Sequence, residues 1–271
     1  MQLIGKELMR KAVVAGQFYP DSKKELTKTL KSFLKIEEDA SIKAAVVPHA
    51  GYFFSGKCAG KVYSLLPCFG TYVILGVNHN AVGKDIAISL EDFETPLGIV
   101  KNDVDLGRAI LHIFGLDEDN EAHRYEHSIE VQLPFLQATH QNFEIVPIIL
   151  KNYNLEVCKS LAKAIVSSAK KLRKKVVLIA SSDFTHSGPD YGFLGSMEID
   201  KEAIYKIAEF NSEEFMKTAD KTTICGSGAI ATVIEAAKLL GSKEAELLEY
   251  YDSSKIAPNV NKVGYAGIVF R

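Results

Sequence analysis

Short apolar runs rich in β-branched residues alternate with amphipathic helical patterns along this sequence, and this alternation most restricts its fold. The runs lie at residues 44–48, 72–77, 86–90, 145–150, 176–180 and 265–270, with a further candidate at 245–251. Apolar residues spaced three and four apart indicate helices at residues 23–34, 56–66, 104–114, 155–172, 201–210 and 227–240. Continuously apolar strands are typical of parallel sheets buried on both faces. The pattern therefore predicts an α/β fold with a mostly parallel central sheet flanked by helices.

The same pattern favours one folding unit. The chain has 271 residues, of which 47% are hydrophobic and 24% charged, so it can form a core and a solvated surface. We find no internal repeat, low-complexity stretch or long linker that would separate two units. We expect a single domain over residues 1–271.

Charge and hydropathy exclude several classes of protein. The 32 basic residues are balanced by 34 acidic ones, and the lysine-rich stretch 170–175 is short. This balance argues against nucleic acid or a membrane surface as a partner. No apolar segment approaches the roughly 20 residues that span a bilayer, and residues 1–18 lack a signal-peptide core, so we expect a cytoplasmic protein. The four cysteines show no dense spacing, and no disulfide framework is expected.

Polar segments follow the predicted strands where ligands usually bind. In parallel sheets, side chains beyond the carboxyl ends of the strands leave the packed layers, and helix N-termini point toward the same region. The polar segments are residues 48–52, 76–80, 181–188 and 223–228. The chemistry of this protein is therefore expected among their side chains.

Three residues in these segments have the donor types of a transition-metal site. His49 and His79 follow successive long strands, and Cys225 precedes a predicted helix whose N-terminus would stabilise its thiolate. Three such ligands leave coordination positions open for water, oxygen or substrate. Each residue alone also fits a hydrogen-bonded histidine or a buried, inert cysteine. Two histidines at consecutive strand ends favour the metal site.

Two further pairs are candidates for proton transfer. Asp183 and His186 leave one strand end three residues apart, where a carboxylate can orient an imidazole. Asp183 also fits a simple turn residue. His127 and Glu130 would share one face of a following helix, which also fits an ordinary solvent-facing helix start.

Taken together, these motifs resemble the Memo family, which is related to the LigB-type class III extradiol dioxygenases. The resemblance runs from residues 16–19 to residues 264–267, in order, and so covers nearly the whole chain. It rests on Pro48-His49-Ala50-Gly51-Tyr52, Gly76-Val77-Asn78-His79, Glu126-His127-Ser128-Ile129-Glu130, Ser182-Asp183-Phe184-Thr185-His186-Ser187-Gly188 and Thr223-Ile224-Cys225-Gly226. It implies the class III extradiol dioxygenase-like fold.

The resemblance also implies a ligand set and a cleft. It assigns iron or copper to His49, His79 and Cys225, with Asp183, His186 and His127 lining the same cleft. LigB-type dioxygenases use a glutamate as the third ligand, and the cysteine puts ring cleavage in doubt because thiolate is softer and can be oxidised. Two local departures are Asn80, where many relatives have histidine, and Phe18, where they often have tryptophan.

Three functions remain open at this point. The first is a metal-dependent oxidoreductase that acts with oxygen species and uses His186 as proton donor. The second is a non-catalytic protein that binds a peptide or small ligand in the cleft. The third is thiol hydrolysis by Cys225, with His186 and Asp183 as base and orienting group. Relatives often occur beside AMMECR-type and radical-enzyme proteins, which suggests a functional link to a modification pathway.

Overall fold

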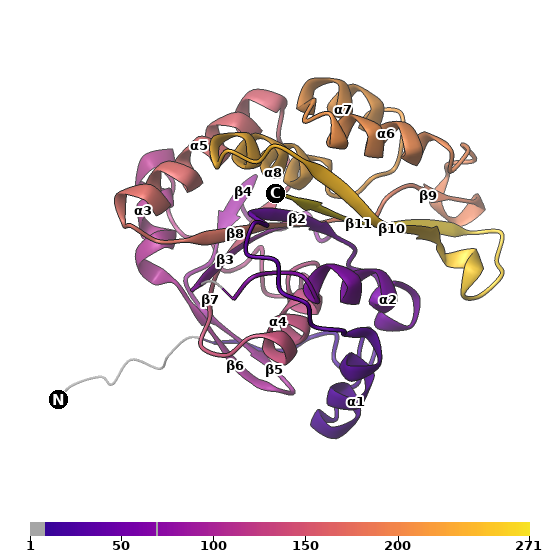
Figure 1. Ribbon diagram of the computed structural model, residues 1–271, viewed down its shortest axis with the longest axis horizontal. Helices are drawn as coiled ribbons and strands as arrows, with labels where there is room; N and C mark the ends of the chain where they lie inside the picture. The colour runs from indigo at the N-terminus through magenta and orange to yellow at the C-terminus, as the bar shows by residue number, and fades with distance from the viewer. Residues whose placement is uncertain (1–8, 69) are drawn as a thin grey trace.

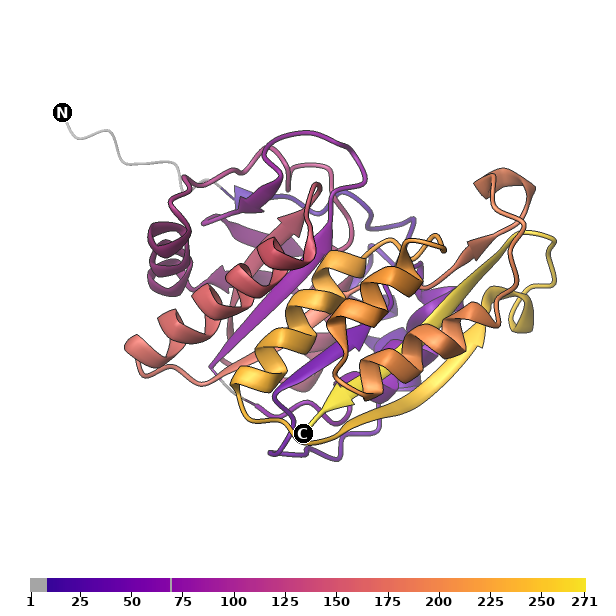
Figure 2. The same cartoon turned by 90° about the horizontal axis from the view of Figure 1, so that it is seen from above.

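A mixed sheet with helices on both sides forms the body of the protein (Figures 1 and 2). The structure is a computed structural model that describes residues 9–68 and 70–271. The described strands join one 11-stranded sheet. The expected domain, residues 1–271, includes residues 1–8 and 69, which lie outside the described residues.

Parallel strands form the centre of this sheet. Their order is β6 (Gly98–Asn102), β7 (Glu144–Leu150), β3 (Thr71–Val77), β8 (Val176–Ser181) and β2 (Ala44–Val47). Antiparallel pairs extend it on both sides, through β11 (Lys262–Phe270) and β10 (Ala245–Asp252) next to β2, and through β5 (Asp92–Thr95) next to β6. Three short strands complete it: β1 (Met9–Arg10), β4 (Ile86–Ile88) and β9 (His186–Ser187). The predicted α/β fold with a parallel central sheet is confirmed.

Two hydrophobic cores lie on opposite faces of the sheet. Along β8, Leu178 and Ala180 belong to one core, and Val177 and Ile179 belong to the other, because successive side chains of a strand point to opposite faces. The first core includes residues of α3 (Val104–Phe114), α5 (Leu155–Lys171), α6 (Ile199–Ala208), α7 (Ser212–Ala219) and α8 (Ser227–Leu239). The second includes residues of α1 (Lys23–Phe33), α2 (Tyr52–Tyr63) and α4 (Leu133–Thr139). Burial on both faces explains why the central strands are apolar throughout.

Several helix boundaries follow from local chemistry. The Asp103 side chain accepts a hydrogen bond from the backbone N–H of Leu106 at the start of α3, and Gly115, with φ of 68°, ends that helix. Asn154 caps α5 in the same way. The sequence pattern does not predict helices α4 and α7, because each is short and its apolar pattern covers only one or two turns. It also does not predict the β5–β6 hairpin, whose strands are short and partly exposed.

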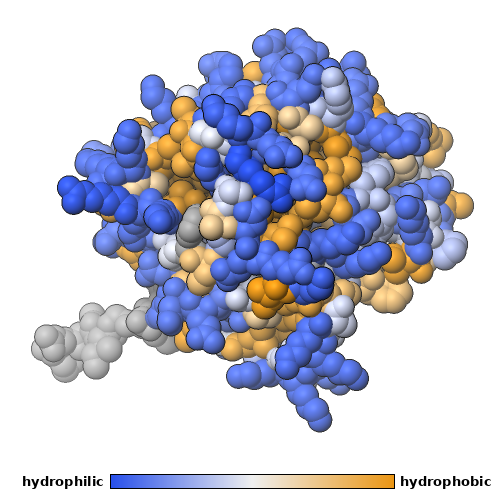
Figure 3. All heavy atoms as spheres, viewed as in Figure 1, coloured by the Kyte–Doolittle hydropathy of each residue, from blue (hydrophilic) through white to orange (hydrophobic). Residues whose placement is uncertain are grey.

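Polar side chains cover much of the face seen in Figure 3, with smaller apolar patches between them. Among the residues that the structure describes, no helix combines the length and apolar character needed to cross a membrane. All four cysteines are free; Cys58 and Cys158 are buried, and Cys68 is exposed.

Candidate metal centre

The carboxyl ends of three neighbouring parallel strands bring the predicted residues together. Strands β3, β8 and β2 are adjacent, and His79, Asp183 and His49 each follow one of them by two residues. All three side chains line one cleft. The location that the sequence predicted, beyond the strand ends, is therefore the location that the fold provides.

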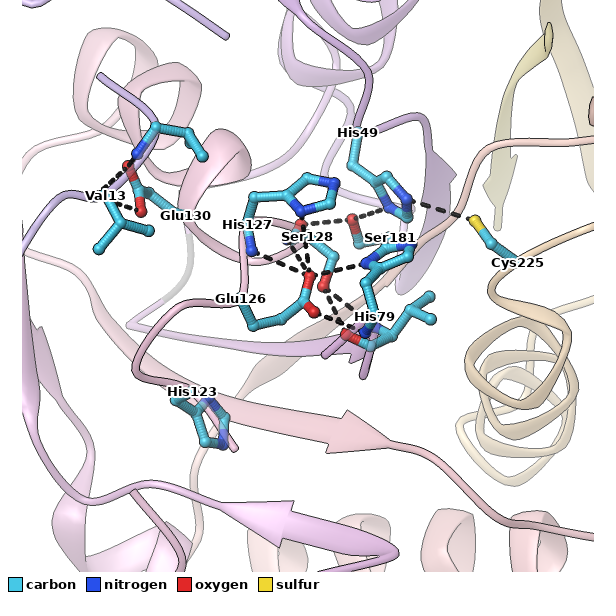
Figure 4. Close-up of polar contacts among 12 residues, drawn as sticks. Val13, His49, His79, His123, Glu126, His127, Ser128, Glu130, Ser181 and Cys225 are labelled. Atoms are coloured by element: carbon cyan, nitrogen blue, oxygen red, sulfur yellow. Dashed lines mark hydrogen bonds and ion pairs between the residues drawn. The ribbon is translucent and has the colours of Figure 1, made fainter. Parts of the chain in front are cut away.

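Three imidazole rings meet at the base of this cleft (Figure 4). One ring nitrogen each of His49, His79 and His127 lies within 4.8 Å of the other two. The ring centroids are 5.2 Å apart for His49 and His79, and 4.6 Å apart for His79 and His127. The family resemblance implies that His127 lines the cleft, and the structure places it beside the two predicted metal ligands.

The Nδ1 atom of His49 is held in place by the hydroxyl group of Ser181. The Ser181 hydroxyl donates to the Ser128 carbonyl at 2.6 Å, so toward the His49 Nδ1, 3.0 Å away, it acts as an acceptor. The ring then carries its proton on Nδ1 and presents the Nε2 lone pair to the cluster. Gln132 supports this arrangement by donating from Nε2 to the Ser181 hydroxyl at 2.8 Å and to the Pro48 carbonyl at 3.0 Å.

A buried carboxylate fixes His79. Glu126, whose side chain is fully buried, lies with Oε1 2.9 Å from the His79 Nδ1 and accepts the backbone N–H of His79 on Oε2 at 2.7 Å. Backbone N–H groups of His127 and Ser128 donate to the same carboxylate, each at 2.9 Å. A carboxylate behind an imidazole is the usual outer partner of a metal-bound histidine, because it holds the tautomer that leaves Nε2 open. The sequence pattern does not reveal this role of Glu126, which lies 47 residues from His79.

Burial and charge set the protonation of the cluster. Burial, followed by the neighbouring His79, lowers the pKa of His49 to about 3. Burial and His49 lower the pKa of His127 to about 4. Burial raises the pKa of Glu126, but the hydrogen bond from His79 and the nearby imidazoles outweigh it and lower that pKa to about 2. Near neutral pH the site thus holds neutral His49 and His127 rings and an ionised Glu126, as metal binding requires.

Cys225 lies at one side of the histidine cluster, just before α8. Its Sγ is 3.3 Å from the His49 Nε2 and 3.6 Å from the Asp183 carbonyl oxygen. The following Gly226 allows this position, since a Cβ there would lie 2.5 Å from the Ser182 Cβ. Burial, followed by the charge of Asp183, raises the pKa of the Cys225 thiol. The expected stabilisation of the thiolate by the helix N-terminus is therefore outweighed in the protein alone.

Asp183 and His186 both line the cleft, but each has other hydrogen-bond partners. Among the described residues, the Asp183 carboxylate accepts backbone N–H groups of His49 at 2.8 Å and Ala50 at 3.3 Å. Burial nevertheless raises its pKa, against the lowering effect of His186. The His186 Nδ1 lies 3.1 Å from the Thr223 carbonyl oxygen, so Nδ1 is the donor and Nε2 is the free acceptor. Asp183 thus positions the His49 loop instead of orienting His186 by a hydrogen bond.

The predicted pairing of His127 with Glu130 is wrong. The Glu130 side chain points away from the histidines, toward Val13 (Figure 4). It forms a buried ion pair with Arg10 and accepts the Tyr19 hydroxyl at 2.5 Å. Residues 130–132 form a 3₁₀ helix, η1 (Glu130–Gln132), and His127 precedes it, so the α-helical spacing assumed from sequence does not apply. The carboxylate beside His127 belongs to Glu126, 3.4 Å from its Nδ1.

The histidines open into a cleft of about 540 Å³, a volume typical of small-ligand sites. Phe18 contacts His127 with tilted rings whose centroids are 4.7 Å apart, and Tyr191 meets the His186 ring edge-on at 5.2 Å. Tyr265 and Val263 of β11 complete the apolar wall. Phe18 is therefore part of a wall of this cleft.

The central strands of the sheet are parallel, and the cleft lies beyond their carboxyl ends. This arrangement is consistent with the class III extradiol dioxygenase-like, or LigB-like, fold. A family model described as Memo-like protein matches residues 10–269. A MEMO1 family protein of Archaeoglobus fulgidus is 41% identical over 265 residues, which cover 97% of this chain and 100% of that protein. Those of Methanosarcina barkeri and Pyrococcus furiosus are each 41% identical and are covered over 99% of their lengths. This chain belongs to the Memo family.

Proposed function

We propose that the protein binds one iron or copper ion in this cleft and acts as a metal-dependent oxidoreductase on oxygen species. The observation that carries the proposal is the convergence of three imidazoles, two of which have their Nδ1 atoms held by hydrogen bonds from outside the cluster. Neutral imidazoles with one open nitrogen each are suited to iron, copper and related ions. A bound ion of this kind would supply one-electron chemistry with oxygen species.

His49 and His79 are ligands in either of two possible sets. The third ligand is Cys225 in the set that the resemblance implies, and His127 in the set that the cluster suggests. A thiolate and an imidazole on one tetrahedral ion, with bonds of about 2.3 and 2.0 Å, lie roughly 3.5 Å apart. The observed 3.3 Å between the Cys225 Sγ and the His49 Nε2 is close to this value. We therefore propose His49, His79 and Cys225 as the ligands. In the metal-free protein only His49, His79 and His127, among the described residues, have ligand atoms within 4.8 Å of one another, so in this proposal Cys225 closes toward His79 as the ion binds and His127 lies beside the ion.

The remaining cleft residues serve binding and proton transfer in this proposal. His186 presents a free Nε2, because its Nδ1 is bonded to the Thr223 carbonyl, and so can take up or return a proton at that atom. Asp183 holds the backbone N–H groups of His49 and Ala50 and fixes the loop that carries the first ligand. The aromatic walls exclude water from a bound substrate.

Metal content tests this proposal directly. The protein is purified without oxygen, reconstituted separately with Fe(II) or Cu(II), and analysed by elemental analysis. Near-stoichiometric metal is expected in the wild type, with loss in His49→Ala, His79→Ala and Cys225→Ser. His112→Ala, on an exposed position of α3, is the matched control and should retain metal.

The outcomes separate the two ligand sets. Retention of metal by Cys225→Ser together with loss in His127→Ala would replace Cys225 with His127 as third ligand. A wild type that stays metal-free after reconstitution would refute the proposal. For a metal-loaded protein, oxygen uptake in the presence of a catechol then tests turnover.

A second function, binding without turnover, is favoured by the size of the cleft and its aromatic walls. In that case a peptide or small ligand occupies the space above the histidines. Measurable binding with no oxygen uptake by the metal-loaded protein would support it. Thiol hydrolysis is disfavoured, because Cys225 contacts His49 instead of His186 and burial raises the thiol pKa.

A further inference from the structure

Apart from its histidines, the ionisable side chains that line the cleft are mainly acidic. Its lining contains two carboxylates, Asp183 at the buried end and Asp190 at an exposed position, and no lysine or arginine among the described residues. Lys255 and Lys262 are near these lining residues in sequence, yet neither lines the cleft. The rest of the lining consists of the four imidazoles of the site, Ser253, two asparagine amides, and aromatic and apolar residues. Away from the histidines at its base, a ligand in this space would therefore meet the Asp190 carboxylate and no lysine or arginine from the part of the chain that the structure describes.

Asp190 is held in a defined position. Its Oδ2 accepts the side-chain N–H of Asn261 at 2.6 Å, and its backbone N–H donates to the Asn261 Oδ1 at 3.1 Å. These bonds join the segment after β9 to the segment before β11, both of which contribute residues to the cleft. The carboxylate is thus a fixed part of the cleft, and its charge acts at the outer end of any bound ligand.

The electrostatic environment of Tyr191 indicates that the negative charge of Asp190 acts inside the cleft. Burial raises the pKa of Tyr191, and the charges of Asp183 and Asp190 raise it further. Phe18, Tyr191 and Tyr265 line the same space with ring surfaces, which favour a flat apolar ligand. The cleft combines these aromatic surfaces with a negative charge near solvent.

We propose that the cleft selects aromatic ligands whose side arm is cationic or neutral, and that Asp190 rejects ligands with an anionic arm such as a carboxylate or phosphate. The inference rests on the proposed function in naming the ligand class of the same cleft.

A matched pair of probes tests the inference. Dopamine and dihydrocaffeate share a catechol ring and a two-carbon arm, which ends in an ammonium group in the first and a carboxylate in the second. A metal ion would meet the same catechol in both probes, so the difference between their affinities measures the effect of the charge on the arm. Isothermal titration calorimetry without oxygen, on metal-free and on metal-loaded protein, should show dopamine binding about tenfold more tightly at low ionic strength.

Asp190→Asn should reduce this preference to about threefold or less, because the variant removes the charge and keeps the shape. Asp117→Asn is the control, since that exposed carboxylate makes the same change in net charge outside the cleft lining. Equal affinities, a preference for dihydrocaffeate, a preference unchanged in Asp190→Asn, or no binding of either probe would overturn the inference. Failure to bind metal would refute the proposed function alone, since the charge preference is also measured on metal-free protein.

Discussion

Replacing Glu126 with glutamine should destabilise the metal-free protein and weaken its metal site. The Glu126 side chain is buried, and its pKa falls from 4.5 to about 2 in the folded protein. A difference of this size corresponds to roughly 3 kcal/mol of stability near neutral pH. Glutamine resembles the protonated acid, so Glu126→Gln should lose about that amount. The loss of the outer partner of His79 should also weaken metal binding by about 10- to 100-fold.

The pH dependence makes this prediction specific. The folded-state pKa is depressed, so the contribution of Glu126 is fully present above about pH 4.5 and is lost as the pH falls toward about 2. Urea unfolding with a chelator present should therefore show a difference between wild type and variant of roughly 3 kcal/mol at pH 7 and roughly 1 kcal/mol at pH 3. Glu121→Gln, at an exposed ion pair in the same segment, is the control. Surface substitutions usually change stability by less than about 0.5 kcal/mol. A difference this small at pH 7 would refute the electrostatic reasoning, and so would a difference that does not change with pH.

Two further predictions concern other parts of the described structure. Arg10→Ala leaves the Glu130 carboxylate buried without its cation and should destabilise the protein by about 3–5 kcal/mol in urea unfolding. The control Arg124→Ala, at an exposed ion pair, should lower the stability by less than about 1 kcal/mol. Similar losses of stability in the two variants would contradict this account. In native metal-free protein at neutral pH, iodoacetamide should modify the exposed Cys68 first, because burial raises the pKa of the Cys58, Cys158 and Cys225 thiols. Peptide mass spectrometry measures the order, and rapid modification of Cys225 would show that its thiol is activated.

Much of the fold could be predicted because the strongest sequence signal and the strongest energetic term coincide. The strands of the parallel centre are buried on both faces, so their apolar runs are continuous, and the predicted run at residues 176–180 agrees with β8 (Val176–Ser181). The β5–β6 hairpin was missed for the converse reason. Gly98 and Ile99 of β6 are exposed, so little of that strand carries a hydrophobic pattern. Prediction succeeded where burial determines the residue types.

The site was predictable only as far as it depends on local position. A histidine directly after a strand has a location fixed by the sheet, which is why His49 and His79 could be placed from sequence. The orientation of their rings depends on partners far along the chain: Ser181 is 132 residues from His49, and Glu126 is 47 residues from His79. Glutamate beside histidine is common on exposed surfaces, so only the burial of Glu126 distinguishes it from an ordinary charged residue. The contacts that decide whether a metal can bind are thus those that the linear pattern does not contain.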